Sequence, residues 1–431
     1  MGVERDDGRL YRRLSVSGAA ATDHARWASI DAVRALAALM VLAAHANRLG
    51  GPVLPGGLTQ RAVGSLAGGV WLFFSVSGFL IAGPFLRALL RGRPRPPAHA
   101  YAVRRAARIL PAYWVAFAAM LVLVSGAQLA HWWQIPVHGL LLHRLVPGES
   151  EKLYFVAWTL GVEGIFYALV PLGAWLVWRF VRGSAAIDVD RLALLILGIW
   201  SASVVWGLSL AAAHPFGPHK PMPAGFSVLY AVVALGNFCP GMLVFLARTR
   251  EASAGRRWWL RYRVAMTRPG LVLTAAVVLF LVAQQLPWQT DPVAYVLFHL
   301  LFGVASGLTL GAVLSGDWVR PFARVLAPIG LISYGIYLWH WVVVSVMEKH
   351  GIHPVASFGV GAAVLHALLL LAITLPLALA SWLLLERPLL RRTALWDRGR
   401  VGPQVSAPAL QAEPVPFFEG VPAPAQEAQA P

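Results

Sequence analysis

The sequence predicts an all-α integral membrane protein, a bundle of about ten transmembrane helices with both termini in the cytoplasm. Hydrophobic residues make up 58% of the 431 residues and charged residues only 13%, whereas about 25% of the residues in soluble domains are charged. The mean hydropathy is +0.64. Because apolar segments of about 20 residues recur along the chain, and each is long enough to cross a bilayer, we expect a multi-pass membrane protein.

Ten segments qualify as membrane spans. In chain order they are centred on residues 32–49, 66–86, 109–128, 155–178, 192–213, 226–247, 270–287, 293–315, 325–347 and 360–385. Together they occupy most of residues 29–395, which we expect to form one transmembrane domain. Residues 1–28 are expected to form a cytoplasmic tail, and residues 396–431, which are rich in Pro and Ala, a disordered cytoplasmic tail.

The distribution of positive charge predicts the orientation in the membrane. If both termini lie inside, all but six of the 36 Lys and Arg residues fall on the cytoplasmic side, as the positive-inside rule requires. The net charge of +17 does not indicate nucleic acid, because the arginines lie between apolar segments and not in the groove of a soluble domain. We therefore expect a plasma membrane protein that contacts lipid and binds no nucleic acid.

The residue types that bind metals do not form a recognisable site. Cys239 is the only cysteine, which excludes an internal disulfide and a cysteine-rich metal cluster. The histidines of the predicted outer loops have no convincing ligand spacing; they are His131, His138, His143, His214 and His219. We expect no metal cofactor.

The first span carries two ionisable residues, Arg34 and His45. They are eleven residues apart, which is three turns plus about 20°, so both side chains lie on one helix face about 16 Å apart. Ionisable residues inside a span usually face a cavity or the bundle interior. A snorkelling Arg34 and a core His45 bonded to another helix are the alternatives. The basic leader and Ala44-His45-Ala46 imitate a signal peptide, but the leader is longer than usual, and we expect the span to remain uncleaved.

Two further segments combine polar groups with helical spacing. Residues 69–80 contain Ser77 and Gly78, small residues that favour close helix packing. Arg105 and Arg108 share a helix face at the start of the third span, a geometry that suits phosphate groups. Ordinary positive-inside charge is the alternative for this arginine pair.

The fourth and ninth spans also carry polar residues. Glu163 lies within the fourth span, and a carboxylate there needs a partner, for which we expect His45. Ser333, Tyr337 and His340 form one polar stripe on the ninth span. At the end of the last span, Glu386 is expected to pair with an inner arginine or to contribute to the site.

These elements occur in an order that resembles the membrane-bound acyltransferase 3 family. The resemblance covers residues 29–395. Thr159 stands where relatives commonly have serine, which keeps the hydroxyl. The motifs are Arg34 with His45, Phe73-Phe74-x-x-Ser77-Gly78-Phe79-Leu80, Arg105-x-x-Arg108-Ile109-x-Pro111, Trp158-x-Leu160-x-x-Glu163, Ser333-Tyr334-x-x-Tyr337-Leu338-x-His340 and Glu386-x-Pro388.

The resemblance implies transfer of an acyl group, with acetyl expected, from cytoplasmic acyl-CoA to a hydroxyl of a sugar, a cell-surface glycan or a lipid-linked saccharide. Some relatives instead modify secreted antibiotics or other small metabolites. The expected catalytic residues are His45, Glu163 and Arg34, with His45 as general base or acyl carrier. The expected residues for binding acyl-CoA are Arg105, Arg108, Ser77, Tyr337 and His340.

Two other classes of protein remain open from the sequence. A transporter or flippase of glycan precursors also needs buried charges, but it does not need an arginine pair beside the 73–80 element. A family member without activity, acting as a partner in polysaccharide assembly, is the second.

Overall fold

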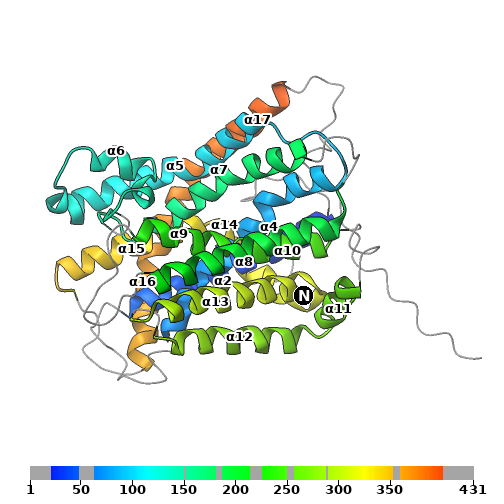
Figure 1. Cartoon of the computed structure of the whole chain (residues 1–431). Coiled ribbons are helices and arrows are strands. Elements are labelled where there is room, and N and C mark those ends of the chain that lie inside the picture. The colour runs from blue at the N-terminus through cyan, green and yellow to red at the C-terminus, as the bar shows by residue number, and fades with distance from the viewer. Residues whose placement is uncertain are drawn as a thin grey trace, which may run out of the picture.

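The computed structural model describes residues 21–47, 63–149, 152–180, 187–213, 226–249, 257–287, 290–352 and 360–400. All regular structure in these ranges is helical, and the long helices lie side by side in one bundle (Figure 1). Eight are long and apolar enough to span a membrane, or up to ten if each of two bent pairs is one span. The predicted all-α membrane fold is therefore confirmed, whereas the orientation of the termini stays a prediction.

The α-helices follow one another with short connections. They are α2 (Ala21–Ala46), α4 (Gly69–Leu90), α5 (Ala98–Met120), α6 (Gln134–Gly139), α7 (Ala157–Phe180), α8 (Val189–Ala213), α9 (Phe226–Gly236), α10 (Cys239–Ala247), α11 (Arg257–Met266), α12 (Pro269–Gln285), α13 (Pro292–Leu314), α14 (Arg320–Leu331), α15 (Ser333–Lys349), α16 (Val360–Ser381) and α17 (Arg387–Arg400).

Short 3-10 and π segments extend or connect these helices. A 3-10 turn, η2 (Ser65–Gly68), precedes α4, and a π segment, η3 (Leu121–Ser125), continues α5. A second π segment, η8 (Trp382–Glu386), joins α16 to α17. The others are η4 (Gly126–Gln128), η5 (His143–Leu145) and η7 (Asp317–Val319).

Two predicted spans are bent, and a third is longer than expected. The segment predicted at 270–287 joins α11 at an angle of 97°, where Pro269 begins α12, because proline cannot continue a preceding helix. The segment predicted at 325–347 bends by 62° between α14 and α15. The third span begins at Ala98 instead of residue 109, because its first eleven residues are basic and escape a hydropathy criterion.

The predicted tails lie mostly outside the described residues. Within the described ranges, α2 already begins at Ala21, inside the predicted 1–28 tail, and α17 continues to Arg400. Residues 1–20 and 401–431 are not described, and so the predicted disorder of the C-terminal tail stays a prediction.

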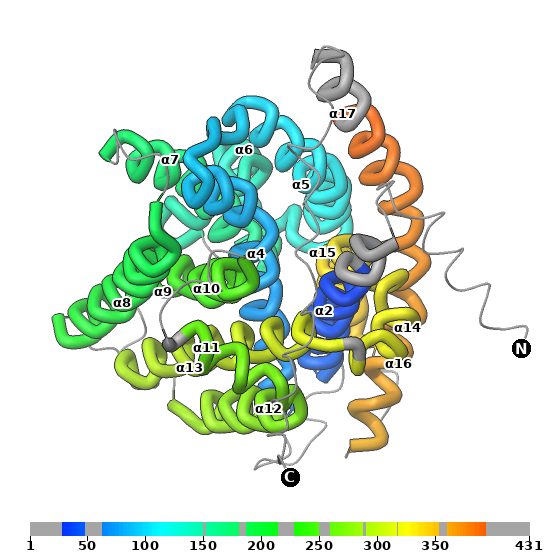
Figure 2. Tube along the Cα trace, turned by 90° about the vertical axis from the view of Figure 1, so that its right-hand side faces the viewer, coloured from blue at the N-terminus to red at the C-terminus, as the bar shows by residue number. Residues whose placement is uncertain are grey.

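Helix α2 lies in the interior of the bundle. It packs against α4, α13, α14, α15 and α16, and Figure 2 shows it beside α14, α15 and α16. Its alanine-rich sequence allows this close approach, since Ala35, Ala37 and Ala46 are fully buried. A Cβ at Gly330 of α14 would collide with the Asp31 carbonyl. The interior position of α2 turns Arg34 and His45 toward neighbouring helices.

Helix α4 crosses α10 at a small-residue contact. A Cβ at Gly78 would collide with the Phe238 carbonyl, which confirms the predicted close packing at this position. Because Gly78 faces α10, its neighbour Ser77 faces α7 instead, where it forms a hydrogen bond with Glu163.

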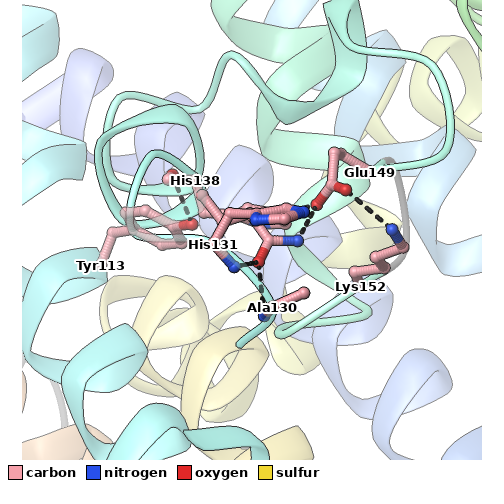
Figure 3. Close-up of polar contacts among 7 residues, drawn as sticks. Tyr113, Ala130, His131, His138, Glu149 and Lys152 are labelled. Carbon is pink, nitrogen blue, oxygen red and sulfur yellow. Dashed lines mark hydrogen bonds and ion pairs between the residues drawn. The ribbon is translucent and has the colours of Figure 1, made fainter. Parts of the chain in front are cut away.

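The segment between α5 and α7 is fixed by the buried carboxylate of Glu149 (Figure 3). It accepts hydrogen bonds from Gln134 Nε2 at 3.0 Å, His138 Nε2 at 3.3 Å and Lys152 Nζ at 2.7 Å. Burial raises the pKa of Glu149, but these hydrogen bonds outweigh burial and lower it below its ordinary value. Burial lowers the pKa of His138 and takes that of His143 to about 3, so both rings are neutral at neutral pH.

Candidate active site

A cavity of about 380 Å³ lies between α2, α4, α5, α7 and α15. Six of the eight predicted site residues line it, although they come from five different helices. They are Arg34, Ser77, Arg105, Arg108, Glu163 and Tyr337. The remaining two, His45 and His340, are not among its lining residues.

One part of the cavity wall is cationic. Arg34 forms an ion pair with Asp31 at 3.1 Å. By contrast, neither Arg105 nor Arg108 forms an ion pair with any described residue, and the buried Nε of Arg105 has no hydrogen-bond partner. The Arg105 guanidinium lies 5.8 Å from the ring centroids of both Tyr101 and Tyr167. Two guanidinium groups of the cavity are therefore available to an anionic ligand.

Glu163 is bound to the cavity wall and not to His45. Its Oε1 accepts hydrogen bonds from Ser77 Oγ and from Tyr167 OH, each at 2.6 Å. The expected Glu163–His45 contact is wrong, because α7 turns Glu163 toward α4. Tyr167, one turn after Glu163 on the same face, was missed, although its i,i+4 spacing was a visible signal.

Glu386 does not form the ion pair expected from the sequence. It is 1% exposed, and its Oε1 accepts a hydrogen bond from Ser381 Oγ at 3.4 Å. No arginine of the described ranges lies within ion-pair distance of its carboxylate.

His45 instead forms a hydrogen bond with His340, with 2.9 Å between His45 Nδ1 and His340 Nε2. The second nitrogen of His340, Nδ1, lies 3.0 Å from the Ile336 carbonyl. Since a carbonyl only accepts, His340 Nδ1 carries the proton and Nε2 is the acceptor. His45 must then donate from Nδ1, which leaves the lone pair of the neutral ring on Nε2. A backbone carbonyl thus fixes the tautomer of His45 through His340.

The histidine pair lies just beyond the end of the cavity. The ring centroids of Tyr337 and His340 are 5.7 Å apart, and those of Phe73 and Tyr337 are 5.9 Å apart. Tyr337 is anchored, because its hydroxyl bonds with Thr159 Oγ1 at 2.7 Å and donates to the Val156 carbonyl at 3.0 Å. Phe73 is held by packing alone. The departure at Thr159 is thus accommodated, since the hydroxyl still bonds with Tyr337.

The segment before α7 covers the histidine pair from another side. Tyr154 OH donates to the Leu338 carbonyl of α15 at 2.7 Å. The rings of Phe155 and Trp341 contact His45, with centroid distances of 6.3 and 4.9 Å. In the described part of the chain, no three His, Cys, Asp or Glu side chains are grouped so that they could hold a metal ion.

Comparisons with known proteins agree with this arrangement. A family model described as an acyltransferase domain matches residues 27–383. The exopolysaccharide production protein ExoZ of Rhizobium meliloti (strain 1021) is 28% identical over 344 residues, which cover 76% of this chain and 90% of the relative. Nodulation protein 10 of Rhizobium leguminosarum bv. viciae is 26% identical over 411 residues, covering 86% and 95%. No solved structure is significantly similar. The chain belongs to the acyltransferase 3 family and is an integral membrane acyltransferase.

Proposed function

We propose that this enzyme transfers an acyl group, with acetyl expected, from cytoplasmic acyl-CoA to a sugar hydroxyl of a cell-surface or lipid-linked saccharide. It does so in the plasma membrane, with both termini cytoplasmic. The observation that carries the proposal is the cavity itself, which has two guanidinium groups without ion-pair partners in its wall and a tautomer-fixed histidine just beyond its end.

The donor side of the proposal rests on Arg105, Arg108 and Arg34. Guanidinium groups bind phosphates through forked, charge-assisted hydrogen bonds. Arg34 and His45 are separated by about 16 Å along α2. A ligand bound by its phosphates at the arginines therefore needs a slender arm to bring its reactive end to His45, and the acyl-pantetheine arm of acyl-CoA has this shape.

The chemistry rests on the lone pair of His45 Nε2. As a general base, Nε2 takes the proton of the acceptor hydroxyl while the oxygen bonds to the thioester carbon, and the carbon–sulfur bond breaks. The imidazolium then returns the proton to the departing CoA sulfur. As an acyl carrier, Nε2 attacks the thioester carbon itself, and the acceptor displaces the histidine in a second step.

Two residues support His45 in this mechanism. In the general-base route, His340 accepts a stronger hydrogen bond from Nδ1 when His45 is protonated, because hydrogen bonds to charged groups are about twice as strong as neutral ones. Glu163 acts from the cavity wall by orienting Ser77, and not on His45. Both are positioning residues in this proposal.

The proposed acceptor is a saccharide because one curated relative is named for exopolysaccharide production. The alternative acceptor, a secreted small molecule, has no support in the cavity or the comparisons.

The test uses the purified full chain in nanodiscs with labelled acetyl-CoA and a cell-envelope saccharide fraction. We expect label in the saccharide, identified by mass spectrometry, and release of CoA that depends on the acceptor. His45→Ala should abolish transfer, whereas His350→Ala, at the exposed end of α15, should not. A folded His45→Ala protein with wild-type turnover would contradict the assignment, and substrate movement without CoA release would indicate a transporter.

A further inference from the structure

A second cavity, of about 800 Å³, lies beside the first. It is formed by the proline-rich turn after α4 and by α7, with Arg93, Arg95, Phe85, Trp175 and Trp178 in its wall. On α7, Tyr167 lines the first cavity and the next residue, Ala168, lines the second. On α4, Ile81 and Phe85, one turn apart, do the same. The two cavities are therefore neighbours along the same helices.

The wall of the second cavity combines cationic groups with flat rings. The Arg95 guanidinium lies 5.3 Å from the ring centroid of Trp178. Neither Arg93 nor Arg95 forms an ion pair with a residue in the described ranges. Trp175 and Trp178 are 42% and 45% exposed, so parts of their rings are open to a ligand. Such a wall fits a ligand that carries both an aromatic ring and a phosphate.

Tyr101 stands between the two cavities. Its ring packs edge-on against Phe85 of the second cavity at 5.2 Å and lies under Arg105 of the first at 5.8 Å. The Tyr101 hydroxyl and the Arg105 Nε are both buried without a hydrogen-bond partner. Buried polar atoms are rarely left unpaired in a native protein, and a polar ligand that passes from one cavity to the other would supply partners for both.

The size of the first cavity also requires a second compartment for acyl-CoA. Pockets of about 300–1,000 Å³ hold drug-sized ligands. A cavity of about 380 Å³ has room for an acyl-pantetheine arm but not for the nucleotide as well. The nucleotide must therefore lie outside it, next to the arginines.

We propose that the second cavity binds the adenosine 3′-phosphate end of acyl-CoA. The adenine ring stacks on the tryptophans, and Arg93 and Arg95 contact the 3′-phosphate, while Arg105 and Arg108 hold the diphosphate at the entrance of the first cavity. This inference rests on the proposed use of acyl-CoA and adds the residues that recognise its nucleotide.

The test compares CoA with 3′-dephospho-CoA, which differs only by the 3′-phosphate. Binding to the purified full chain in nanodiscs of zwitterionic lipid is measured by isothermal titration calorimetry. Because a hydrogen bond to a charged group contributes about 1.5–3 kcal/mol, we expect the wild type to bind CoA at least about 10-fold more tightly. The double variant Arg93→Gln/Arg95→Gln should bind both ligands equally, whereas Arg191→Gln, an exposed arginine outside the cavity, should keep the difference.

A second variant examines the ring contacts. Trp178→Ala should weaken CoA and 3′-dephospho-CoA alike, by about 10-fold if stacking contributes 1–3 kcal/mol, and leave 4′-phosphopantetheine, which lacks adenosine, unaffected. An equal loss for all three ligands would overturn the stacking contact.

The outcomes separate this inference from the proposed function. An unchanged ratio between CoA and 3′-dephospho-CoA in the double arginine variant overturns the inference alone. The same holds if that variant loses affinity for both ligands equally and only in nanodiscs of anionic lipid, since the arginines would then bind a lipid headgroup. Failure of the wild type to bind any of these ligands overturns the proposed function as well.

Discussion

Replacement of His340 tests whether the histidine pair is catalytic machinery or merely well packed. His340→Ala removes the acceptor that bonds with His45 Nδ1 at 2.9 Å and so releases the tautomer that the Ile336 carbonyl fixes. A hydrogen bond to a charged group contributes about 1.5–3 kcal/mol, and each 1.4 kcal/mol corresponds to a factor of ten in rate. We therefore expect kcat to fall about 10- to 100-fold.

The same substitution should leave the KM for acyl-CoA almost unchanged, because His340 does not line the cavity. The assay is steady-state transfer of labelled acetyl groups in nanodiscs. Added imidazole, which fits the space left by the deleted ring, should restore part of kcat. His350→Ala on the same helix is the matched control.

Two results would refute this reasoning. One is a rise in KM at constant kcat, which would place His340 in acyl-CoA binding. The other is a folded variant whose lost activity imidazole does not restore at any concentration, which would assign His340 to packing.

Four further outcomes follow from the contacts described above. Arg105→Gln should raise the KM for acyl-CoA about 10-fold with little change in kcat, and a fall in kcat alone in steady-state assays would contradict this. Phe73→Ala should extend the cavity and raise the kcat/KM for butyryl-CoA relative to acetyl-CoA about 10-fold or more; an unchanged ratio would show that Phe73 does not close the cavity. Gly78→Ala should destabilise the protein by about 1–3 kcal/mol in thermal unfolding, whereas Gly164→Ala, with nothing within 4 Å of the new Cβ, should not. Glu149→Gln should cost about 1–2 kcal/mol near neutral pH; since the folded-state pKa of Glu149 is lowered, its contribution is present above about pH 4.5 and is lost as the pH falls further, so a difference that persists in strong acid would count against the carboxylate.

The fold and most of the cavity could be predicted because both depend on patterns within single helices. The spacing of Arg34 and His45, and that of Arg105 and Arg108, follows from helical geometry alone. The apolar runs likewise predicted the number of spans within the range that the structure supports. The bend before α12 was also visible in principle, since Pro269 must begin a helix.

The partners across helices could not be predicted, because they depend on how each helix is rotated against its neighbours. Glu163 and His45 were expected to meet from their depth in the membrane. Their rotation is set by close contacts such as Gly78 against α10 and Gly330 against α2, and these direct Glu163 to Ser77 and His45 to His340. A single sequence carries the small residues but not the helix that each one contacts.

The contact between Phe73 and Tyr337 has a consequence for the membrane itself. A polar cavity that continued past these rings to the histidine pair would offer protons and ions a path through the bundle. Each elementary charge that crosses a potential of 100 mV releases about 2.3 kcal/mol, so an open path would dissipate the gradient on which the cell depends. With Phe73 closed against Tyr337, the two rings act as a permeability barrier. Because Phe73 is held by packing alone, this barrier opens only where a bound ligand displaces it, and the ligand then fills the path that it has opened.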